Sequence, residues 1–176
     1  MSSSTAGHPR EHPNVEAAGQ SAADDPWNRR GMTRLETTTA PTHPPIPTDE
    51  DIRQRVGDLL DRAVRRQWWT LYLDDQDVQR PVLMPMAGYP EDPHEPCGAE
   101  GTVAEVLANR LASIVGEIGA AKVVFVWERP GSDELMSGDR EWAGALGAAC
   151  RAAGVDVRAQ LVLHGGGVRW IAQDDA

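Results

Sequence analysis

The segment Lys122–Trp127 constrains the fold of this chain more than any other part of the sequence. After the lysine, all five residues are apolar, so the segment has no polar face. A strand of this kind is buried on both faces, as in α/β sheets that helices cover on each side. The segment therefore predicts the central strand of an α/β sheet. The loop that follows it is the first place to look for a ligand site.

Three segments have the start signals and the apolar spacing of amphipathic helices. Thr48 and Thr102 are each followed, three residues later, by an acid that completes a capping box. Ser137 with Asp139 gives a third start signal. Apolar residues recur at helical spacing after each start. The predicted helices run from Thr48 to about Gln67, from Thr102 to Gly119 and from Ser137 to Gly154.

A first hairpin is predicted between the first two helices. Trp68–Leu73 is rich in aromatic and aliphatic residues, and an acidic turn separates it from Pro81–Met86. Pro81 and Pro85 lack a backbone N–H, so the second arm is expected at an edge of the sheet. Adjacent residues of a strand point to opposite faces, so Trp68 and Trp69 are expected on different faces of the sheet. Core packing is the preferred interpretation of these two side chains.

A second hairpin is predicted at the end of the chain. Val155–Leu163 and Val168–Ile171 flank three glycines, which we interpret as a turn rather than a phosphate loop because no helix follows. His164 beside the glycines is interpreted as a turn or surface residue rather than a catalyst. The order helix, hairpin, helix, strand, helix, hairpin predicts a single compact α/β domain with a mixed sheet.

Residues 1–48 differ in composition from the rest of the chain. They hold seven of the 13 prolines and show no apolar periodicity, so they bury too little surface to offset the entropy of ordering. We predict a disordered tail over residues 1–48 and one α/β domain over residues 49–176. Trp27–Arg30 and Met32–Leu35 form an apolar and basic island in the tail, either a short docking motif or an accidental cluster.

Charge and hydropathy exclude several classes of protein. Lys and Arg number 17 against 27 Asp and Glu, which gives a formal net charge of -10 and a pI of about 4.9. A duplex nucleic-acid binder needs a basic face, so this class is excluded. No apolar run approaches the roughly 18 to 20 residues that span a bilayer, and the start lacks the apolar stretch of a secretory signal. We therefore expect a cytoplasmic protein with no membrane or nucleic-acid partner.

The candidates for metal binding and for known catalytic motifs are weak. Cys97 and Cys150 are too few for a four-cysteine metal cluster or a disulfide framework, and both are expected to be reduced. His94 and Cys97 lie among acids in the loop at 90–101, for which a solvated loop is the preferred interpretation. The phosphate-loop, nucleophile-elbow and zinc-helix motifs are absent from the sequence. No metal, cofactor or catalytic residue is therefore assigned.

The segment after the central strand resembles a known family. It reads Trp127-Glu128-Arg129-Pro130-Gly131-Ser132-Asp133, and then has Ser137, a helix, Gly154 and a strand pair. Over residues 120–172 this order is similar to that of the JAB/MPN domain in its RadC-like form. In that family the strand ends in His-Xaa-His-Pro-Ser-Gly-Asp, and a serine follows seven residues after the proline. Pro130 and Ser137 keep this spacing, and the resemblance implies a JAB-like fold.

The metal-binding positions of that family are not matched. Its two histidines fall on Trp127 and Arg129, and its metal-binding aspartate falls on Arg140, with Asp139 one residue away. Zinc needs lone-pair donors, and neither indole nor guanidinium supplies one. The catalytic glutamate is not matched either, since the nearest candidate, Glu105, has an unsuitable spacing. The resemblance therefore implies a relative without the zinc-dependent isopeptidase activity of the family.

The leading functional prediction is a non-catalytic α/β module, a metal-free JAB-like domain that binds a protein or a small ligand through the loop after the central strand. The candidate binding residues are Trp127, Glu128, Arg129, Ser132, Asp133, Asp139 and Arg140, with His164 and Arg169 as secondary candidates. For the charged residues among them, exposed salt bridges and helix-end charges are the simplest interpretation.

Two alternatives stay open. The first is a hydrolase-type enzyme of unrecognised class. Its acid or base would be Glu128 or Asp139, and Arg129 or Arg169 would bind an anionic substrate. His164 would be the proton shuttle. This alternative requires these groups to converge on one cleft. The second is a structural subunit or homodimer that pairs through the Trp68 hairpin, and it requires a large exposed apolar patch there.

Overall fold

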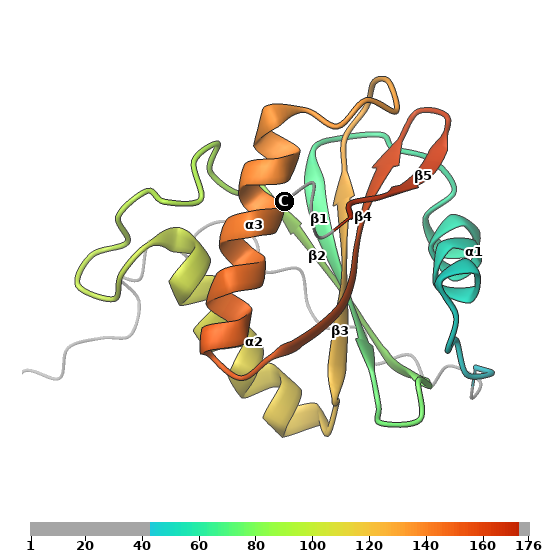
Figure 1. The fold of residues 1–176 in the computed structure, drawn as a ribbon, viewed down its shortest axis with the longest axis horizontal. Helices are drawn as coiled ribbons and strands as arrows, with labels where there is room; N and C mark the ends of the chain where they lie inside the picture. The colour runs from blue at the N-terminus through green and yellow to red at the C-terminus, as the bar shows by residue number, and fades with distance from the viewer. Residues whose placement is uncertain (1–42, 173–176) are drawn as a thin grey trace, which may run out of the picture. The chain divides into compact units, whose positions relative to one another are not determined.

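The structure, a computed structural model, describes residues 43–172. Within these residues it contains three helices and five strands (Figure 1). The helices are α1 (Asp49–Leu60), α2 (Val103–Ile118) and α3 (Ser137–Ala152). The strands are β1 (Gln67–Leu73), β2 (Gln79–Ala87), β3 (Lys122–Glu128), β4 (Asp156–His164) and β5 (Gly167–Trp170). None of these three helices has the length and apolar character needed to cross a membrane.

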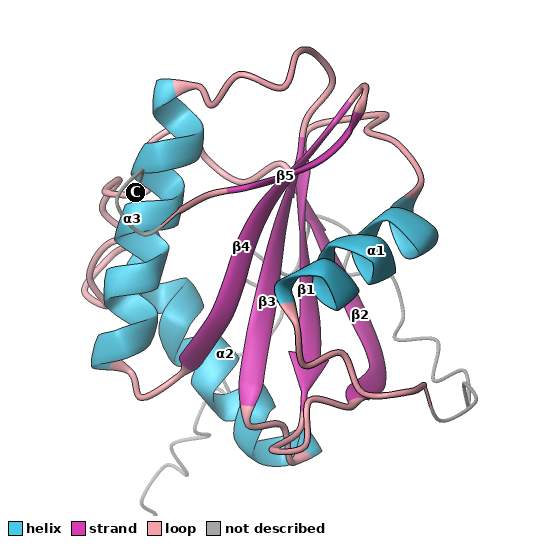
Figure 2. Cartoon of the chain, turned by 45° about the vertical axis from the view of Figure 1, so that its right-hand side comes forward, coloured by secondary structure: helices cyan, strands magenta, loops and turns pink. Residues whose placement is uncertain are grey.

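The five strands form one mixed sheet in the order β2-β1-β3-β4-β5. Strands β3 and β4 are parallel and are joined through α3, whereas the other neighbouring pairs are antiparallel. Helices α2 and α3 pack on one face of the sheet and α1 packs on the other, as Figure 2 shows. The predicted α/β domain with a mixed sheet and the predicted order of its elements are thereby confirmed.

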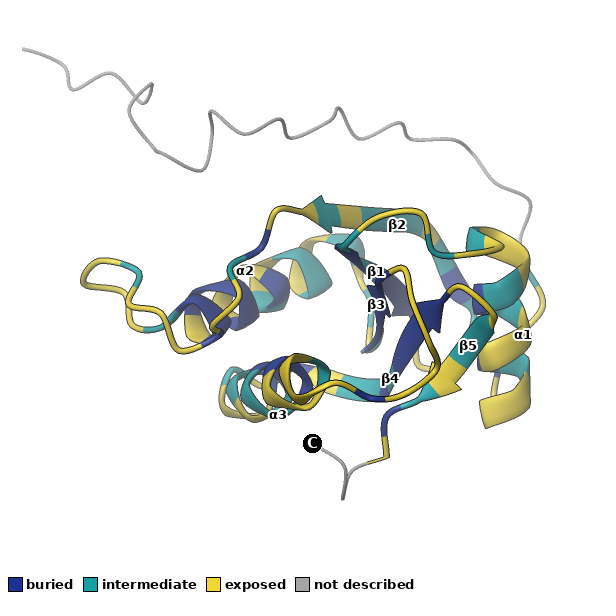
Figure 3. Ribbon diagram, turned by 90° about the horizontal axis from the view of Figure 1, so that it is seen from above, coloured by how far each residue is buried: buried dark blue, intermediate teal, exposed yellow. Residues whose placement is uncertain are grey.

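Strand β3 is the central strand of the sheet, as its apolar run predicts. Every residue from Val123 to Trp127 is at most 2% exposed, and Figure 3 shows this buried centre from above. The side chains alternate between the cluster under α2 and α3 and the cluster under α1. Because the run is fully enclosed, any function of this strand depends on the residues at and beyond its end, Glu128 and Arg129.

Strands β1 and β2 form the predicted hairpin, and β2 is an edge strand. Pro81 and Pro85 lie on β2, where a missing N–H is tolerated because no strand lies on the outer side. Trp68 and Trp69 belong to opposite core clusters, as their adjacency predicts. Within the described residues, no exposed large apolar side chain lies on β1 or β2. Most apolar side chains of β2 are nevertheless half-buried rather than buried, so the homodimer alternative stays a prediction.

Helix α1 is shorter than the sequence predicts: it ends at Leu60 rather than near Gln67. Asp61 follows it with a φ of 51°, outside the range of a right-handed helix. Two amides of the following loop, residues 61–66, then donate to the carboxylate of Glu128 on β3 instead of to helix carbonyls. A long-range acceptor, which apolar periodicity does not reveal, thus replaces the last turns of the predicted helix.

The folded domain begins before Asp49, within the last residues of the predicted tail. Ile46 is 3% exposed and packs in the cluster under α1, and its N–H donates to the carbonyl oxygen of Asp77 at 2.9 Å. The predicted boundary between residues 48 and 49 is therefore moved to a position before Ile46, because this buried side chain is part of the core. Residues 1–42, with the island at 27–35, lie outside the described residues.

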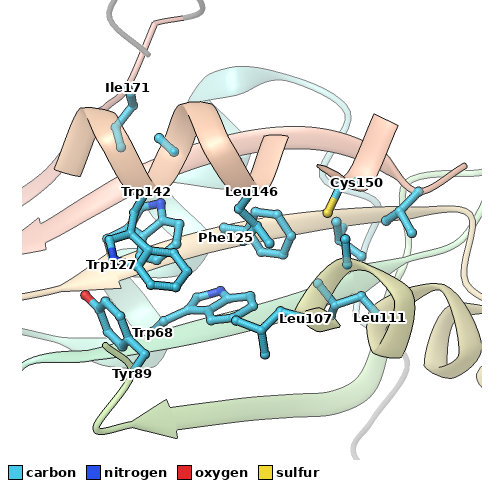
Figure 4. Close-up of a cluster of buried hydrophobic side chains, with 14 of the residues drawn as sticks. Trp68, Tyr89, Leu107, Leu111, Phe125, Trp127, Trp142, Leu146, Cys150 and Ile171 are labelled. Carbon is cyan, nitrogen blue, oxygen red and sulfur yellow. The ribbon is translucent and has the colours of Figure 1, made fainter. Parts of the chain in front are cut away.

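Aromatic side chains fill the core between the sheet and helices α2 and α3 (Figure 4). The ring of Trp127 stacks on Trp68 with centroids 5.4 Å apart, and it lies 5.8 Å from the rings of Tyr89 and Trp142. Its indole nitrogen donates to the side-chain oxygen of Gln160 at 3.2 Å. Trp127, predicted as a binding residue, is thus a core residue only 2% exposed. Its position inside an aromatic core leaves it no surface for a ligand.

Candidate functional site

The candidate site is the end of the sheet at which the parallel strands β3 and β4 finish, which we call the carboxyl edge. Four connections belong to this end: the α1–β1 loop (residues 61–66), the loop after β2 (residues 88–102), the β3–α3 loop (residues 129–136) and the β4–β5 turn (residues 165–166), as can be followed in Figure 1. Ligands of α/β proteins bind beyond the carboxyl ends of strands. Glu128 and Arg129 lie at this end of β3, and their contacts decide what the edge can do.

The carboxylate of Glu128 is a buried acceptor with four N–H donors. The residue is 2% exposed. Oε1 accepts from the amides of Val64 at 2.7 Å and Arg65 at 3.1 Å, and Oε2 accepts from Gln67 Nε2 at 2.5 Å and Trp69 Nε1 at 2.7 Å. Since a carboxylate offers about four acceptor positions, all of them are used within the domain. Glu128 therefore joins the α1–β1 loop and β1 to the end of β3.

These donors keep Glu128 ionised. Burial by itself would raise the pKa of the carboxyl group, but the hydrogen bonds, first from the Val64 amide and then from Trp69 and Gln67, outweigh it and hold the pKa below its ordinary value of 4.5. Because the folded state has the lower pKa, the stabilisation is fully present above pH 4.5 and is lost as the pH falls through the folded-state value. A carboxylate of this kind is a poor proton donor at neutral pH.

Arg129 holds the β3–α3 loop on the other face of the sheet. The residue is 9% exposed. Its Nε donates to both carboxylate oxygens of Asp139, at 2.8 and 3.1 Å, and its other two nitrogens donate to the carbonyl oxygens of Ser132 and Glu134. The two side chains of this ion pair are only 11% and 10% exposed. All three nitrogens of the guanidinium thus donate to the domain's own loop and helix.

Arginines bind four successive carbonyl groups of the β3–α3 loop. In addition to the two bonds from the buried guanidinium, Arg169 Nη1 donates to the carbonyl oxygen of Asp133 at 2.8 Å, and Arg140 Nη1 donates to that of Leu135 at 2.9 Å. The carbonyls of residues 132 to 135 therefore all accept from guanidinium groups. These bonds support the observed conformation of the loop.

Asp139 also caps helix α3. Its Oδ2 accepts from the amide of Met136 at 2.9 Å, so the same carboxylate serves both the helix start and the ion pair. Ser137 with Asp139 predicts the start of this helix, and Ser137 is indeed its first residue. The capping position, however, is Met136, whose own side chain makes no capping bond; Asp139, at the third helical position, supplies only the other bond of a capping box, in which it accepts from the backbone amide of the capping residue.

The structure does not bring the predicted acid and base groups around one cleft. The Glu128 carboxylate lies on the α1 face, bonded to the α1–β1 loop and to Trp69, whereas Asp139 binds its arginine beside α3 on the opposite face. His164 is the last residue of β4 and is only 9% exposed, so it is neither a turn nor a surface residue; its Nδ1 accepts from the amide of Gly166 at 3.1 Å. Within residues 43–172, the convergence that the hydrolase alternative requires is therefore not found.

The remaining predicted residues lie at the surface of the carboxyl edge. Ser132, Asp133, Arg140 and Arg169 are all exposed. Arg140 and Arg169 are thus accessible to a partner even though their guanidinium groups donate to carbonyls of the loop.

No metal centre is apparent in the part of the chain that the structure describes. Residues 43–172 contain no group of three or more His, Cys, Asp or Glu side chains that could hold a metal ion. The positions that the family resemblance assigns to metal ligands are occupied by a core indole, Trp127, and by guanidinium groups that bind loop carbonyls. Cys97 and Cys150 are free cysteines, and burial raises the pKa of the Cys150 thiol to about 12.

Sequence reasoning missed several residues that support the carboxyl edge. Arg66 donates to the carbonyl oxygens of Tyr89 at 2.8 Å and Pro90 at 3.1 Å, and its guanidinium carbon lies 3.8 Å from the centroid of the Tyr89 ring. Trp142 Nε1 also donates to the Pro90 carbonyl, at 3.1 Å. These bonds fix the loop after β2. One sequence signal was available: the polar pair Arg66 and Gln67 directly precedes an aromatic strand.

Comparison with known proteins does not assign a family. No family model matches the chain, and no curated protein matches it. The resemblance of residues 120–172 to the JAB/MPN domain therefore stays a prediction, and the function has to be argued from the carboxyl edge itself.

Proposed function

We propose that this domain is a non-catalytic interaction module that binds a partner protein through the loops of the carboxyl edge. One observation carries the proposal. The two most exposed large apolar side chains of the described residues are Val64, 69% exposed on the α1–β1 loop, and Met136, 59% exposed at the end of the β3–α3 loop. These are the loops that Glu128 and Arg129 hold in place.

Rigid presentation of apolar side chains favours binding. An apolar side chain in water gains free energy when a partner covers it. A loop that is already ordered loses little conformational entropy on binding, which leaves more of that gain for affinity. Exposed polar residues such as Ser132 and Asp133 would then form the polar rim that surrounds the apolar contacts of a typical interface.

The same hydrogen bonds argue against a catalytic role for the edge. Glu128 accepts from four donors, and Arg129 and Asp139 bind each other, so all three groups are engaged with the domain itself rather than open to a substrate. A general base needs an acceptor position directed at the proton that it removes. The family resemblance without metal ligands supports the same proposal.

Capture of partners from an extract of the source cells, with the full-length chain as bait, tests the proposal. The double variant Val64→Ser, Met136→Ser is expected to recover the partner at least about tenfold less than the unchanged protein, because lost apolar anchors cost more than the 1.4 kcal/mol that a tenfold change requires. Its melting temperature should not fall, since both side chains are exposed and serine is a favoured residue at the N-cap of α3.

Leu59→Ser is the matched control for this experiment. Leu59 is 38% exposed and lies on α1, outside the two loops, so this variant should recover the partner as well as the unchanged protein does. Equal recovery by all three proteins would contradict the proposal. Catalytic turnover that disappears in the variant Asp139→Asn would contradict it as well.

A further inference from the structure

The β4–β5 turn is bonded to two loops of the carboxyl edge. The carbonyl oxygen of His164, next to the turn, accepts from the amide of Ala63 in the α1–β1 loop at 3.5 Å. The amide of Gly165 donates to the carbonyl oxygen of Gly131 in the β3–α3 loop at 3.1 Å. The turn therefore bridges two loops that are far apart in the sequence.

The end of β3 provides a second link between the same loops. Glu128 binds the α1–β1 loop on one face of the sheet, and Arg129, the next residue, binds the β3–α3 loop on the other. The amide of Arg129 donates to the carbonyl oxygen of Leu163 at 3.0 Å, which ties this strand end to β4 just before the turn. The two loops are therefore anchored to adjacent residues at the end of one strand, and that strand end is bonded to β4.

We infer that the α1–β1 loop, the β4–β5 turn and the β3–α3 loop open and close as one cooperative unit. Local opening in proteins commonly involves contiguous units that share hydrogen bonds and packing. For a bound partner, the consequence is that its contact at Met136 changes the order around Val64. This consequence rests on the proposed function. The cooperative opening itself is a property of the free protein and can be measured without any partner.

The glycines of the turn allow a sharp test. A Cβ added at Gly165 would lie 3.2 Å from the carbonyl oxygen of Gly131, a crowded contact with backbone, so Gly165→Ala should weaken the bond between turn and loop. A Cβ added at Gly166 would lie 3.4 Å or more from the ring of His164, an ordinary contact distance. Gly166→Ala is therefore the matched control, since it makes the same substitution one residue away.

The readout is amide hydrogen exchange in the full-length chain. The amides of Val64 and Arg65 report on the α1–β1 loop, the amide of Met136 reports on the β3–α3 loop, and that of Phe125 reports on the central strand. Gly165→Ala should speed exchange in both loops by about tenfold, with the two factors agreeing within about twofold, as expected for one opening unit. Exchange in the central strand should not change.

Two results would overturn the inference: faster exchange in the β3–α3 loop while Val64 and Arg65 keep their rates, or an equal effect of the control Gly166→Ala. If Gly165→Ala does not fold, Arg169→Gln replaces it, because it removes the bond to the carbonyl of Asp133 and should also speed exchange at Val64. The exchange result does not depend on the proposed function. Loops that open together are compatible with a double variant at Val64 and Met136 that still captures the partner. Loops that open separately are compatible with a double variant that no longer does.

Discussion

Replacing Glu128 with alanine is expected to lower the free energy of unfolding by about 3 to 5 kcal/mol, because it leaves four N–H donors without their acceptor. Each unsatisfied buried polar group costs roughly 1 to 3 kcal/mol, and water that enters the vacated space offsets part of the sum. The α1–β1 loop should lose its order first, since two of the four donors are its amides.

Urea unfolding monitored by tryptophan fluorescence measures this effect. Glu128→Gln keeps one acceptor oxygen and should lose roughly 1 to 3 kcal/mol, less than the alanine variant. Glu117→Ala serves as the matched control, because Glu117 is an exposed acid on α2 and its replacement should leave stability nearly unchanged. A loss below about 1 kcal/mol for Glu128→Ala would show that the carboxylate does not hold the loop.

The ion pair between Arg129 and Asp139 is expected to give the second-largest effect. Arg129→Met should cost about 2 to 4 kcal/mol, because it leaves a sheltered carboxylate without its partner and releases two loop carbonyls. Asp139→Asn should cost a similar amount, since the asparagine can still accept from the amide of Met136 but lacks the charge that pairs with Arg129. The double variant should lose about 1 to 3 kcal/mol less than the sum of the two single losses, because the two residues share one interaction.

A double-mutant cycle by chemical denaturation measures this coupling. The pair Arg53 and Glu50 is the matched control, because its side chains are 47% and 66% exposed and solvent screens their attraction. That pair should show no measurable coupling. Strictly additive losses at Arg129 and Asp139 would mean that the two side chains act independently, against the contacts that the structure places between them.

Local sequence patterns predicted the parts of the fold whose causes are local. The run Val123–Trp127 predicted a strand buried on both faces, and the prolines of β2 predicted an edge strand. Thr48 and Thr102 predicted two helix starts through capping boxes, which need only residues one turn apart. Hydrophobic period and cap chemistry are both properties of short segments, so one sequence is enough to read them.

The features that local patterns did not predict depend on contacts between distant residues. The donors to Glu128 lie 59 to 64 residues earlier in the chain, and nothing in the spacing of apolar residues marks them. The same contacts explain why α1 ends at Leu60 and why Glu128 is a structural acceptor rather than a candidate base. Ile46 was assigned to the tail for a similar reason, since its burial depends on a sheet that forms later in the sequence.

The sequence predicted which residues lie near the end of the central strand, but not how these residues are organised there. The sequence pointed to the loop after the central strand, and Glu128, Arg129, Asp139 and Arg169 do lie at that edge. It did not show that Glu128 and Asp139 face opposite sides of the sheet. From their residue types alone, these side chains could be catalytic acids and bases. Their hydrogen-bond partners, which come together only in the folded chain, indicate instead that they hold the loops in place.

The most direct test of the role of Glu128 is a pH titration of its side-chain carboxyl carbon by NMR in the full-length protein. If the carboxylate serves the fold, its midpoint should lie below the ordinary value of 4.5, and its protonation should coincide with loss of order at Val64 and Arg65. A midpoint near or above pH 6, in a domain that stays folded, is the behaviour of a catalytic acid. That result would contradict the non-catalytic interpretation of the carboxyl edge.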